Sequence, residues 1–404
     1  MLLKMQSAGN MIRTVMENKF GFIMKRVSVI IITLLIILSC QERHDSYPSV
    51  SKTSKVSNYI TSVETSSVVL DTAIATSYRG KMDIVNGQLC FIDYMYCYMY
   101  FIDGAGKLIK RDLGIGNGPK EINCGAISTH SFFKDGGVSF YGSSDDVYVY
   151  SNEYVQNKDA SFRIRRDYSK MAENVKPDPQ AFETYTFPRF MVCRSWNEKT
   201  YINNNSAAYG FNYFETPDDY SQNCRIITEY DIPNKKIGRL LGKGLPEIYQ
   251  GTSDRNYIFS EFTFDIDEEG NFYVAFMADS LIYKFNKDFK PVVAFGRRGR
   301  NMDVDYLKVT NSKEIYPKAN EQYESKGWYT WAEYIPEKNW VCRSYHKGAH
   351  STTDGLQIYD GDNNLIADID VPVGFKPIGY IHPYLYSDII SENNTSVFYK
   401  IAVE

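Results

Sequence analysis

Short apolar and aromatic runs alternate with polar turns along most of the chain. Each copy of the pattern opens on a turn at Asp, Glu or Asn followed by Gly, then continues through an apolar run, an aromatic-rich run and a third strand-like run. The clearest copies span Glu269–Gly296, Asn86–Gly114 and Asp135–Tyr150. Runs of about four to six residues rich in Val, Ile, Tyr and Phe between such turns are typical of β-strands. No sustained helical periodicity competes with them, so we predict an all-β chain.

The pattern repeats along the chain about every 40–55 residues, and this period indicates which all-β fold to expect. Stretched copies follow at Thr200–Gly242 and Trp340–Val371, and a partial copy fills Tyr380–Val403. Four strands in each unit of about 40–55 residues, repeated about six times, predict a six-bladed β-propeller of four-stranded blades. Because the last copy is short, we expect the strand-like segment Ser66–Ser77 to close the ring from the N-terminal side. A pair of β-sandwiches is the alternative, although it needs no repeat of this length.

Three units end in related glycine loops, at Leu113–Ile122, Leu241–Ile248 and Phe295–Arg300. The first loop, Gly116-Asn117-Gly118-Pro119-Lys120-Glu121, fits a Gly-x-Gly-Pro-x-Glu pattern; the second fits it loosely, and the third keeps the glycines. In these loops the chain resembles the TolB-like six-bladed β-propeller lipoproteins of Gram-negative bacteria, from about Val56 to the C-terminus. The resemblance implies the propeller fold and says little about activity.

The N-terminal region has the layout of a lipoprotein signal. Met24-Lys25-Arg26 precede the apolar run Val27–Leu38, which at about a dozen residues is shorter than the roughly 20 that span a bilayer. The run ends at Ile37-Leu38-Ser39-Cys40, which resembles a bacterial lipobox and implies a lipid on Cys40. We therefore predict that residues 1–39 are a signal peptide, whose true start is Met24. A flexible lipidated tether over 40–58 and a propeller over 59–404 follow. The protein is expected in the cell envelope, at the outer membrane, with periplasmic or surface display left open.

Charge and cysteine spacing exclude several classes of function. Without residues 1–39 the chain keeps 40 of 45 basic and 48 of 49 acidic residues, so its net charge is −8 rather than −4. A nucleic-acid-binding protein needs a basic surface, so we expect no nucleic-acid partner. No cysteine pair has the C-x-x-C spacing of zinc or thioredoxin-like sites. The disulfide pairing of the remaining cysteines stays open: Cys90, Cys97, Cys124, Cys193, Cys224 and Cys342.

Three motifs resemble ligand sites and fail on their context. Gly114-x-Gly116-x-Gly118 is followed by Pro119 and a β pattern, where a dinucleotide loop needs a helix. Asp265-x-Asp267-x-Glu269-Gly270 begins like a calcium loop, but Phe276 stands where the twelfth position requires Glu. His346 and His350 have the spacing of zinc ligands on a helix, yet strands flank them. We therefore predict no metal and no cofactor.

One face of the predicted propeller collects unusual loops. The glycine loops and two insertions, Asn204–Asn223 and His346–Asp354, open on the same face, and insertions gathered on one face often mark a binding surface. The first insertion is rich in aromatic residues, which suit sugars or peptides unless the insertion folds back and packs its own rings. The predicted binding face comprises Lys120, Glu121, Tyr209, Phe211, Tyr213, Glu247, Arg297, Arg298, Arg300, His346 and His350.

Two classes of function follow. The preferred one is a lipid-anchored binding or scaffold module for a glycan, a peptide or a protein of the envelope. The alternative is a polysaccharide hydrolase or lyase with acid–base carboxylates in the propeller mouth. No Gly-x-Ser-x-Gly nucleophile motif is present in the sequence, and no spacing singles out a carboxylate pair, so the sequence does not decide between them. A convergent set of acidic and basic groups with displaced pKa values would favour the enzyme.

Overall fold

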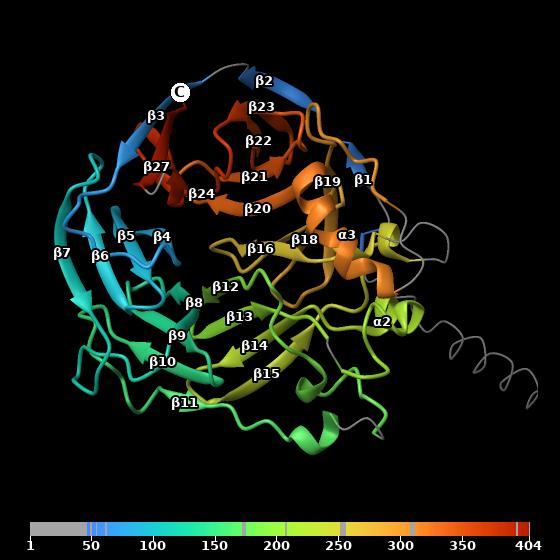
Figure 1. The fold of residues 1–404 in the computed structure, drawn as a ribbon, viewed down its shortest axis with the longest axis horizontal. Coiled ribbons are helices and arrows are strands. Elements are labelled where there is room, and N and C mark those ends of the chain that lie inside the picture. The colour runs from blue at the N-terminus through green and yellow to red at the C-terminus, as the bar shows by residue number, and fades with distance from the viewer. Residues whose placement is uncertain are drawn as a thin grey trace, which may run out of the picture. The chain divides into compact units, whose positions relative to one another are not determined.

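The computed structural model confirms the all-β six-bladed propeller (Figure 1). It describes residues 47–48, 51–53, 55–60, 63–171, 175–206, 208–250, 256–307, 312–392 and 395–403. The predicted signal peptide and Cys40 lie outside the described residues. No helix among the described residues is long and apolar enough to cross a membrane.

The first three blades follow each other in chain order, and in each the first strand is innermost. Blade one contains β4 (Gly80–Val85), β5 (Gln88–Asp93), β6 (Tyr98–Ile102) and β7 (Leu108–Leu113). Blade two contains β8 (Ile127–Phe132), β9 (Val138–Gly142), β10 (Asp146–Tyr150) and the short β11 (Phe162–Arg163). Blade three contains β12 (Cys193–Trp196), β13 (Lys199–Asn203), β14 (Ile227–Asp231) and β15 (Lys236–Leu241).

The second half of the ring repeats the arrangement. Blade four contains β16 (Phe262–Ile266), β17 (Phe272–Phe276), β18 (Ile282–Phe285) and β19 (Pro291–Gly296). Blade five contains β20 (Trp328–Ile335), β21 (Trp340–His346), β22 (Asp354–Tyr359) and β23 (Leu365–Val371). Blade six contains β24 (Pro377–Ile381), β25 (Tyr384–Ser387), β26 (Ile390–Glu392) and β27 (Thr395–Ala402).

An N-terminal strand closes the ring, as predicted. β3 (Glu64–Val69) pairs antiparallel with β27, so that Ser67 lies opposite Tyr399, and it supplies the outer strand of blade six. The strand is shorter than the predicted segment 66–77 and begins two residues earlier. Because β3 pairs with β27, backbone hydrogen bonds between the N-terminal and C-terminal strands hold the ring closed.

Residues within the predicted tether, 40–58, pair with the propeller. β1 (Ser51–Thr53) lies parallel to β19, and β2 (Val56–Ile60) lies parallel to β23, so each adds a fifth strand at the outer edge of a blade. The Tyr47 hydroxyl donates to the Gly244 carbonyl at 2.9 Å. The chain therefore reaches β3 along the outer edges of blades four and five.

The helices lie in the connections between strands. α2 (Pro217–Asn223) lies in the insertion of blade three, and α3 (Ser312–Ser325) lies between blades four and five (Figure 1). Short 3-10 helices form at Tyr168–Met171, Phe182–Thr184, Glu247–Tyr249 and Tyr257–Phe259.

Strand order defines two faces of the ring. We name as the upper face the one that carries the connections between blades and the loops between second and third strands. The lower face carries the hairpins between first and second strands. The innermost strands β4, β8, β12, β16, β20 and β24 surround the axis, and side chains from each of them line the centre of the ring. These side chains decide what the centre of the ring contains.

Candidate functional site

Polar and charged side chains from five of the six blades meet in a pocket at the centre of the ring, and blade six contributes Ile378 and Gly379. The pocket has a volume of about 220 Å³ and is lined by residues of every innermost strand. Pro336 and Glu337, from the hairpin after β20, also line it, which places its opening on the lower face. Its ionisable members are Lys81, Asp83, His130, Arg194, Asp265, Glu333 and Glu337.

One network in this pocket joins blades one and two. The Asp83 carboxylate contacts the Lys81 ammonium through one oxygen and His130 Nε2, at 2.6 Å, through the other. The other nitrogen of His130 lies 3.0 Å from the Tyr94 hydroxyl. Lys81 and Asp83 are two residues apart and therefore share one face of β4. Their side chains keep 13% and 15% of their surface exposed, whereas His130 keeps none, so the first two are the groups that a ligand could touch.

The pKa values in this network move with their surroundings. Burial alone would raise the pKa of Asp83, but Lys81 and His130 together hold it well below its usual range. Burial lowers the pKa of His130 and outweighs the opposing effect of Asp83. At neutral pH the network therefore contains an ionised carboxylate beside a neutral imidazole.

A second network joins blades three, four and five through Arg194. The guanidinium of this β12 residue lies 3.0 Å from an Asp265 oxygen through Nε and 2.5 Å from a Glu333 oxygen through a terminal nitrogen. The backbone N–H of Tyr334 donates to the second oxygen of Asp265 at 2.7 Å. Three blades are thus linked by one buried cation.

The two carboxyl groups around Arg194 are pushed toward their protonated forms. Burial raises the pKa of Glu333 to about 7, against the pull of Arg194 and with help from the charge of Asp265. Burial likewise raises the pKa of Asp265. Glu333 can therefore gain or lose a proton near neutral pH, while Asp83 across the pocket stays ionised.

An indole ring lies beside these networks. Trp331 is two residues before Glu333 on β20, and its Nε1 donates to the Glu333 carboxylate at 2.9 Å. Its ring centroid lies 5.2 Å from the Arg194 guanidinium carbon, and the ammonium nitrogens of Lys81 and Lys376 are each 5.6 Å away. Cations at such distances are attracted to an aromatic face. The ring therefore adds an attraction for these three cations.

The arrangement offers hydrogen-bond donors and acceptors of both charges within one small volume. Lys81 and Arg194 donate, whereas Asp83, Asp265 and Glu333 accept, and partial protonation of Glu333 brings the charge close to balance. Among the described residues there is no group of three or more His, Cys, Asp or Glu side chains that could hold a metal ion. The pocket can bind a polar ligand of small net charge, or transfer a proton through Glu333.

The predicted binding face shows a different arrangement, beginning with the insertion of blade three. Phe211 and Tyr213 are buried, and both rings contact Tyr220, with centroids 5.4 and 6.0 Å apart. Tyr209 is 58% exposed. The insertion has folded back on its own aromatic residues, so Phe211 and Tyr213 are not presented on the face. Removing the apolar surface of these two rings from water lowers the free energy of the folded chain, so the rings pack inside the insertion.

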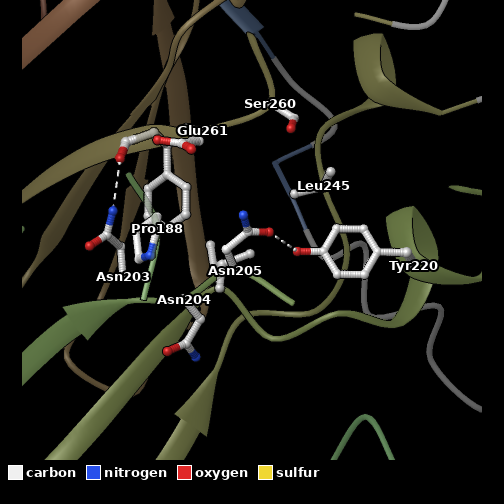
Figure 2. A pocket seen from close by; sticks show the side chains of 10 residues that line it. Pro188, Asn203, Asn204, Asn205, Tyr220, Leu245, Ser260 and Glu261 are labelled. Carbon is white, nitrogen blue, oxygen red and sulfur yellow. Dashed lines mark hydrogen bonds between the residues drawn. The ribbon is translucent and has the colours of Figure 1, made fainter. Parts of the chain in front are cut away.

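A small pocket beside this insertion is filled by its own polar groups (Figure 2). Its volume of about 10 Å³ has room for roughly one water molecule. The Tyr220 hydroxyl donates to Asn205 Oδ1 at 3.3 Å, and Asn203 Nδ2 donates to the Phe262 carbonyl at 3.2 Å. Burial raises the pKa of Glu261, which accepts from the backbone N–H of Phe190 at 3.3 Å. These groups join blades three and four and leave no space for a ligand.

In the first glycine loop, the side chain of Glu121 binds the backbone of the loop itself. A carboxylate oxygen of Glu121 accepts from the Gly118 N–H at 2.7 Å, and a Cβ on Gly116 would overlap that carboxylate. Lys120 is half exposed, 3.6 Å from Asp112. Glu121 therefore shapes the loop.

The remaining predicted residues are spread over the upper face. Arg300 pairs with Asp370 at 2.6 Å, and Arg297 and Glu247 are exposed. Arg298 donates to the Met302 carbonyl at 2.6 Å and lines an upper-face pocket of about 430 Å³. His346 Nδ1 lies 2.8 Å from an Asp354 oxygen, while His350 is exposed. Of the predicted set, Arg298 is the residue that lines this pocket.

The central residues are not among those predicted from the sequence, although the sequence contains a signal for them. The repeated pattern was recognised from the second strand of each blade onward, and the innermost strand precedes it. Asp83, His130 and Asp265 lie three to five residues before the turns at Asn86, Asp135 and Glu269. Asp265 was considered only as part of a failed calcium loop. A polar residue three to five positions before the turn of blades one, two and four is therefore the signal for these central positions.

Comparison with known proteins identifies relatives in fold. No protein-family profile and no curated protein matches the chain. The chain is similar to the crystal structure of a DUF4221 family member from Bacteroides vulgatus, with 12% identity over 87% of this chain and 99% of that one, and a TM-score of 0.62. It is also similar to a Bacteroides fragilis protein described as exported, with 12% identity over 88% and 100% of the two chains and a TM-score of 0.49. At such low identity the first likeness shows a shared fold.

Proposed function

We propose that the domain is a binding module whose ligand site is the central pocket, and that the ligand is a small, hydroxyl-rich molecule such as the end of a glycan. The observation that carries this proposal is the convergence of ionisable groups from five of the six innermost strands on one pocket. Residues more than 200 positions apart in the sequence, from Lys81 to Glu333, share this pocket. A rigid ring of blades holds them in place without the mobility of loops.

The balance of charge favours a neutral polar ligand. Within the two networks, two cations face three carboxyl groups, and burial raises the pKa of Glu333 to about 7, which brings their charge close to balance. The fourth carboxyl group, Glu337, lies at the exposed rim. A sugar hydroxyl donates one hydrogen bond and accepts others. It can therefore donate to a carboxylate of the pocket and accept from Lys81 or Arg194. An anion would instead require cations without partners, and both Lys81 and Arg194 are paired.

The size of the pocket limits the ligand. Its volume of about 220 Å³ lies below the roughly 300–1,000 Å³ of pockets for drug-sized molecules. The lower-face opening admits a single ring or the terminal unit of a longer chain. A folded protein partner cannot enter and would have to contact the surface, for which the upper-face pocket at Arg298 is the alternative location.

One observation favours the enzymatic alternative, a glycan hydrolase or lyase. The pKa of Asp83 is held low while that of Glu333 is raised to about 7, so one carboxyl group is ionised and the other can carry a proton at neutral pH. Such a separation is typical of acid–base pairs in catalysis. The short contact between Glu333 and Arg194 argues against this role, because the guanidinium already binds the carboxylate oxygen that would have to exchange a proton with the substrate.

The proposed location is the cell envelope, with the chain held at the outer membrane by a lipid on Cys40. The basic residues, apolar run and lipobox-like sequence before Cys40 support this proposal. The glycine loops support a relationship to TolB-like propellers in particular.

A thermal-melt screen of the full chain against oligosaccharides, peptides and envelope proteins tests the proposal. A ligand at 100 times its Kd should raise stability by about 2.7 kcal/mol, which a melt detects. We expect a saturable shift with a class of oligosaccharide, and we expect Lys81→Met to weaken it at least tenfold. Lys158→Met changes an exposed lysine outside the pocket and serves as the matched control.

Arg298→Ala separates the two locations. If binding is lost in Arg298→Ala and kept in Lys81→Met, the site is the upper-face pocket and the proposal is wrong. Release of shortened sugars from a bound oligosaccharide, abolished by Glu333→Gln, would establish the enzyme instead. A shift with proteins alone would indicate a surface scaffold.

A further inference from the structure

Two thiols meet beside the first network of the central pocket. Cys97 Sγ lies 3.9 Å from Cys124 Sγ, and 27 residues separate them in the sequence. Cys97 ends the turn between β5 and β6 in blade one, whereas Cys124 lies in the connection that leads to β8 in blade two. The other described cysteines are buried free thiols: Cys90 lies in blade one on β5, and Cys193, Cys224 and Cys342 lie in other blades.

We propose that Cys97 and Cys124 are a covalent modification site that forms a disulfide between blades one and two. Two sulfur atoms in contact need a shift of about 2 Å to reach the bond length of about 2.05 Å. Cys124 is half-buried, whereas Cys97 is fully buried, so Cys124 is the sulfur nearer to solvent.

The two thiols have different roles in the reaction. The hydrogen bond with Cys97 lowers the pKa of the Cys124 thiol, and the same contact and burial raise the pKa of Cys97. Cys124 is therefore the nucleophile, because the thiolate is the reactive form and this sulfur is the more accessible one.

The oxidant is the disulfide of a thiol–disulfide exchange partner. The Cys124 thiolate attacks one of its sulfurs, forms a mixed disulfide and releases one thiol. Cys97 then loses its proton to the released thiolate or solvent and attacks the Cys124 sulfur, which expels the second thiol. Two protein thiols are oxidised and one disulfide is reduced to two thiols.

The position of the bond explains what it would control. The backbone N–H of Ile127, at the start of β8, donates to the Tyr94 carbonyl at 2.8 Å. Tyr94 lies three residues before Cys97, and Ile127 lies three residues after Cys124. The Tyr94 hydroxyl in turn contacts His130, the histidine of the central network. A bond between the sulfurs fixes the two segments that place Tyr94 and His130.

Peptide mapping of the full chain tests the cross-link without any ligand. The protein is treated with oxidised glutathione, its free thiols are alkylated in denaturant, and it is digested without reductant. We expect a peptide that links Cys97 to Cys124, with Cys90, Cys193, Cys224 and Cys342 alkylated. If both cysteines are recovered alkylated or as separate glutathione adducts, the proposal is wrong.

Reduction of the oxidised protein tests the consequence. We expect the melting temperature to fall by about 5 °C, because a cross-link over this loop length restricts the unfolded chain. Amide exchange around Ile127 should rise on reduction. Cys90→Ala removes a buried thiol of the same blade and should keep both responses, whereas Cys124→Ala should lose them. Equal melting and exchange in the oxidised and reduced protein would show that the bond does not fix these segments.

Discussion

The centre of the ring and the upper-face insertion of blade three both collect polar and aromatic side chains, with opposite results. In the centre, charged groups from distant strands meet around open space, where Lys81 and Asp83 keep part of their surface accessible. In the insertion, neighbouring aromatic residues contact one another, and Phe211 and Tyr213 are buried. The aromatic residues of the insertion therefore stabilise the insertion itself, whereas the charged groups accessible to a ligand lie on regular strands.

The difference has a physical cause. A loop of about 20 residues can bend until its own apolar rings leave water, which lowers its free energy. Innermost strands of a propeller cannot do this, because each is fixed by hydrogen bonds to its blade. Side chains that point to the axis therefore meet the side chains of other blades, and charges there pair across blades or face the pocket.

The largest expected effect concerns the cation that links three blades. Arg194→Met leaves Asp265 and Glu333 buried without their partner, which should lower the free energy of unfolding by about 3–5 kcal/mol. Denaturant unfolding followed by fluorescence measures the change. Arg163→Met removes an exposed arginine paired with Asp146 and should leave the midpoint nearly unchanged. Equal midpoints for the two variants would contradict a structural role for the central network.

A smaller effect is expected from the insertion. Phe211→Ala should cost about 3 kcal/mol, because the buried ring leaves a cavity among Tyr213 and Tyr220. Tyr209→Ala, two residues away and 58% exposed, should stay within about 0.5 kcal/mol. The same unfolding measurement compares them. If Tyr209→Ala were the more damaging change, the insertion would not be packed as described.

The smallest effect is a dependence on pH through Glu333. Burial raises its pKa to about 7 in the folded state, so the folded chain keeps a proton that the unfolded chain loses above its ordinary pKa of 4.5. Stability should therefore fall as pH rises from about 4.5 to 7, by no more than about 3 kcal/mol, and then level off.

Glu333→Gln tests this dependence, because the amide cannot titrate. The stability of the wild type relative to this variant should decrease across the window from about pH 4.5 to 7. Glu337→Gln, at the exposed rim of the same pocket, should keep the wild-type slope. A wild-type slope in Glu333→Gln would assign the dependence to another group.

The sequence by itself determined the class, the repeat and the closure of the fold. Turns such as Asn86-Gly87 and strands rich in Val, Ile and Tyr are local signals, and their spacing predicted six blades and an N-terminal closing strand, now seen as β3. Local signals suffice here because turn type and strand pattern depend on neighbouring residues.

The tertiary structure alone decided where the candidate site lies. Lys81, His130, Arg194 and Glu333 are far apart in the sequence, and nothing in their immediate neighbours shows that they meet. It also decided that Phe211 and Tyr213 turn inward, since their burial depends on Tyr220 and the blades beneath. Closing the ring brings six strands to one axis, and contacts made by that closure depend on all blades at once.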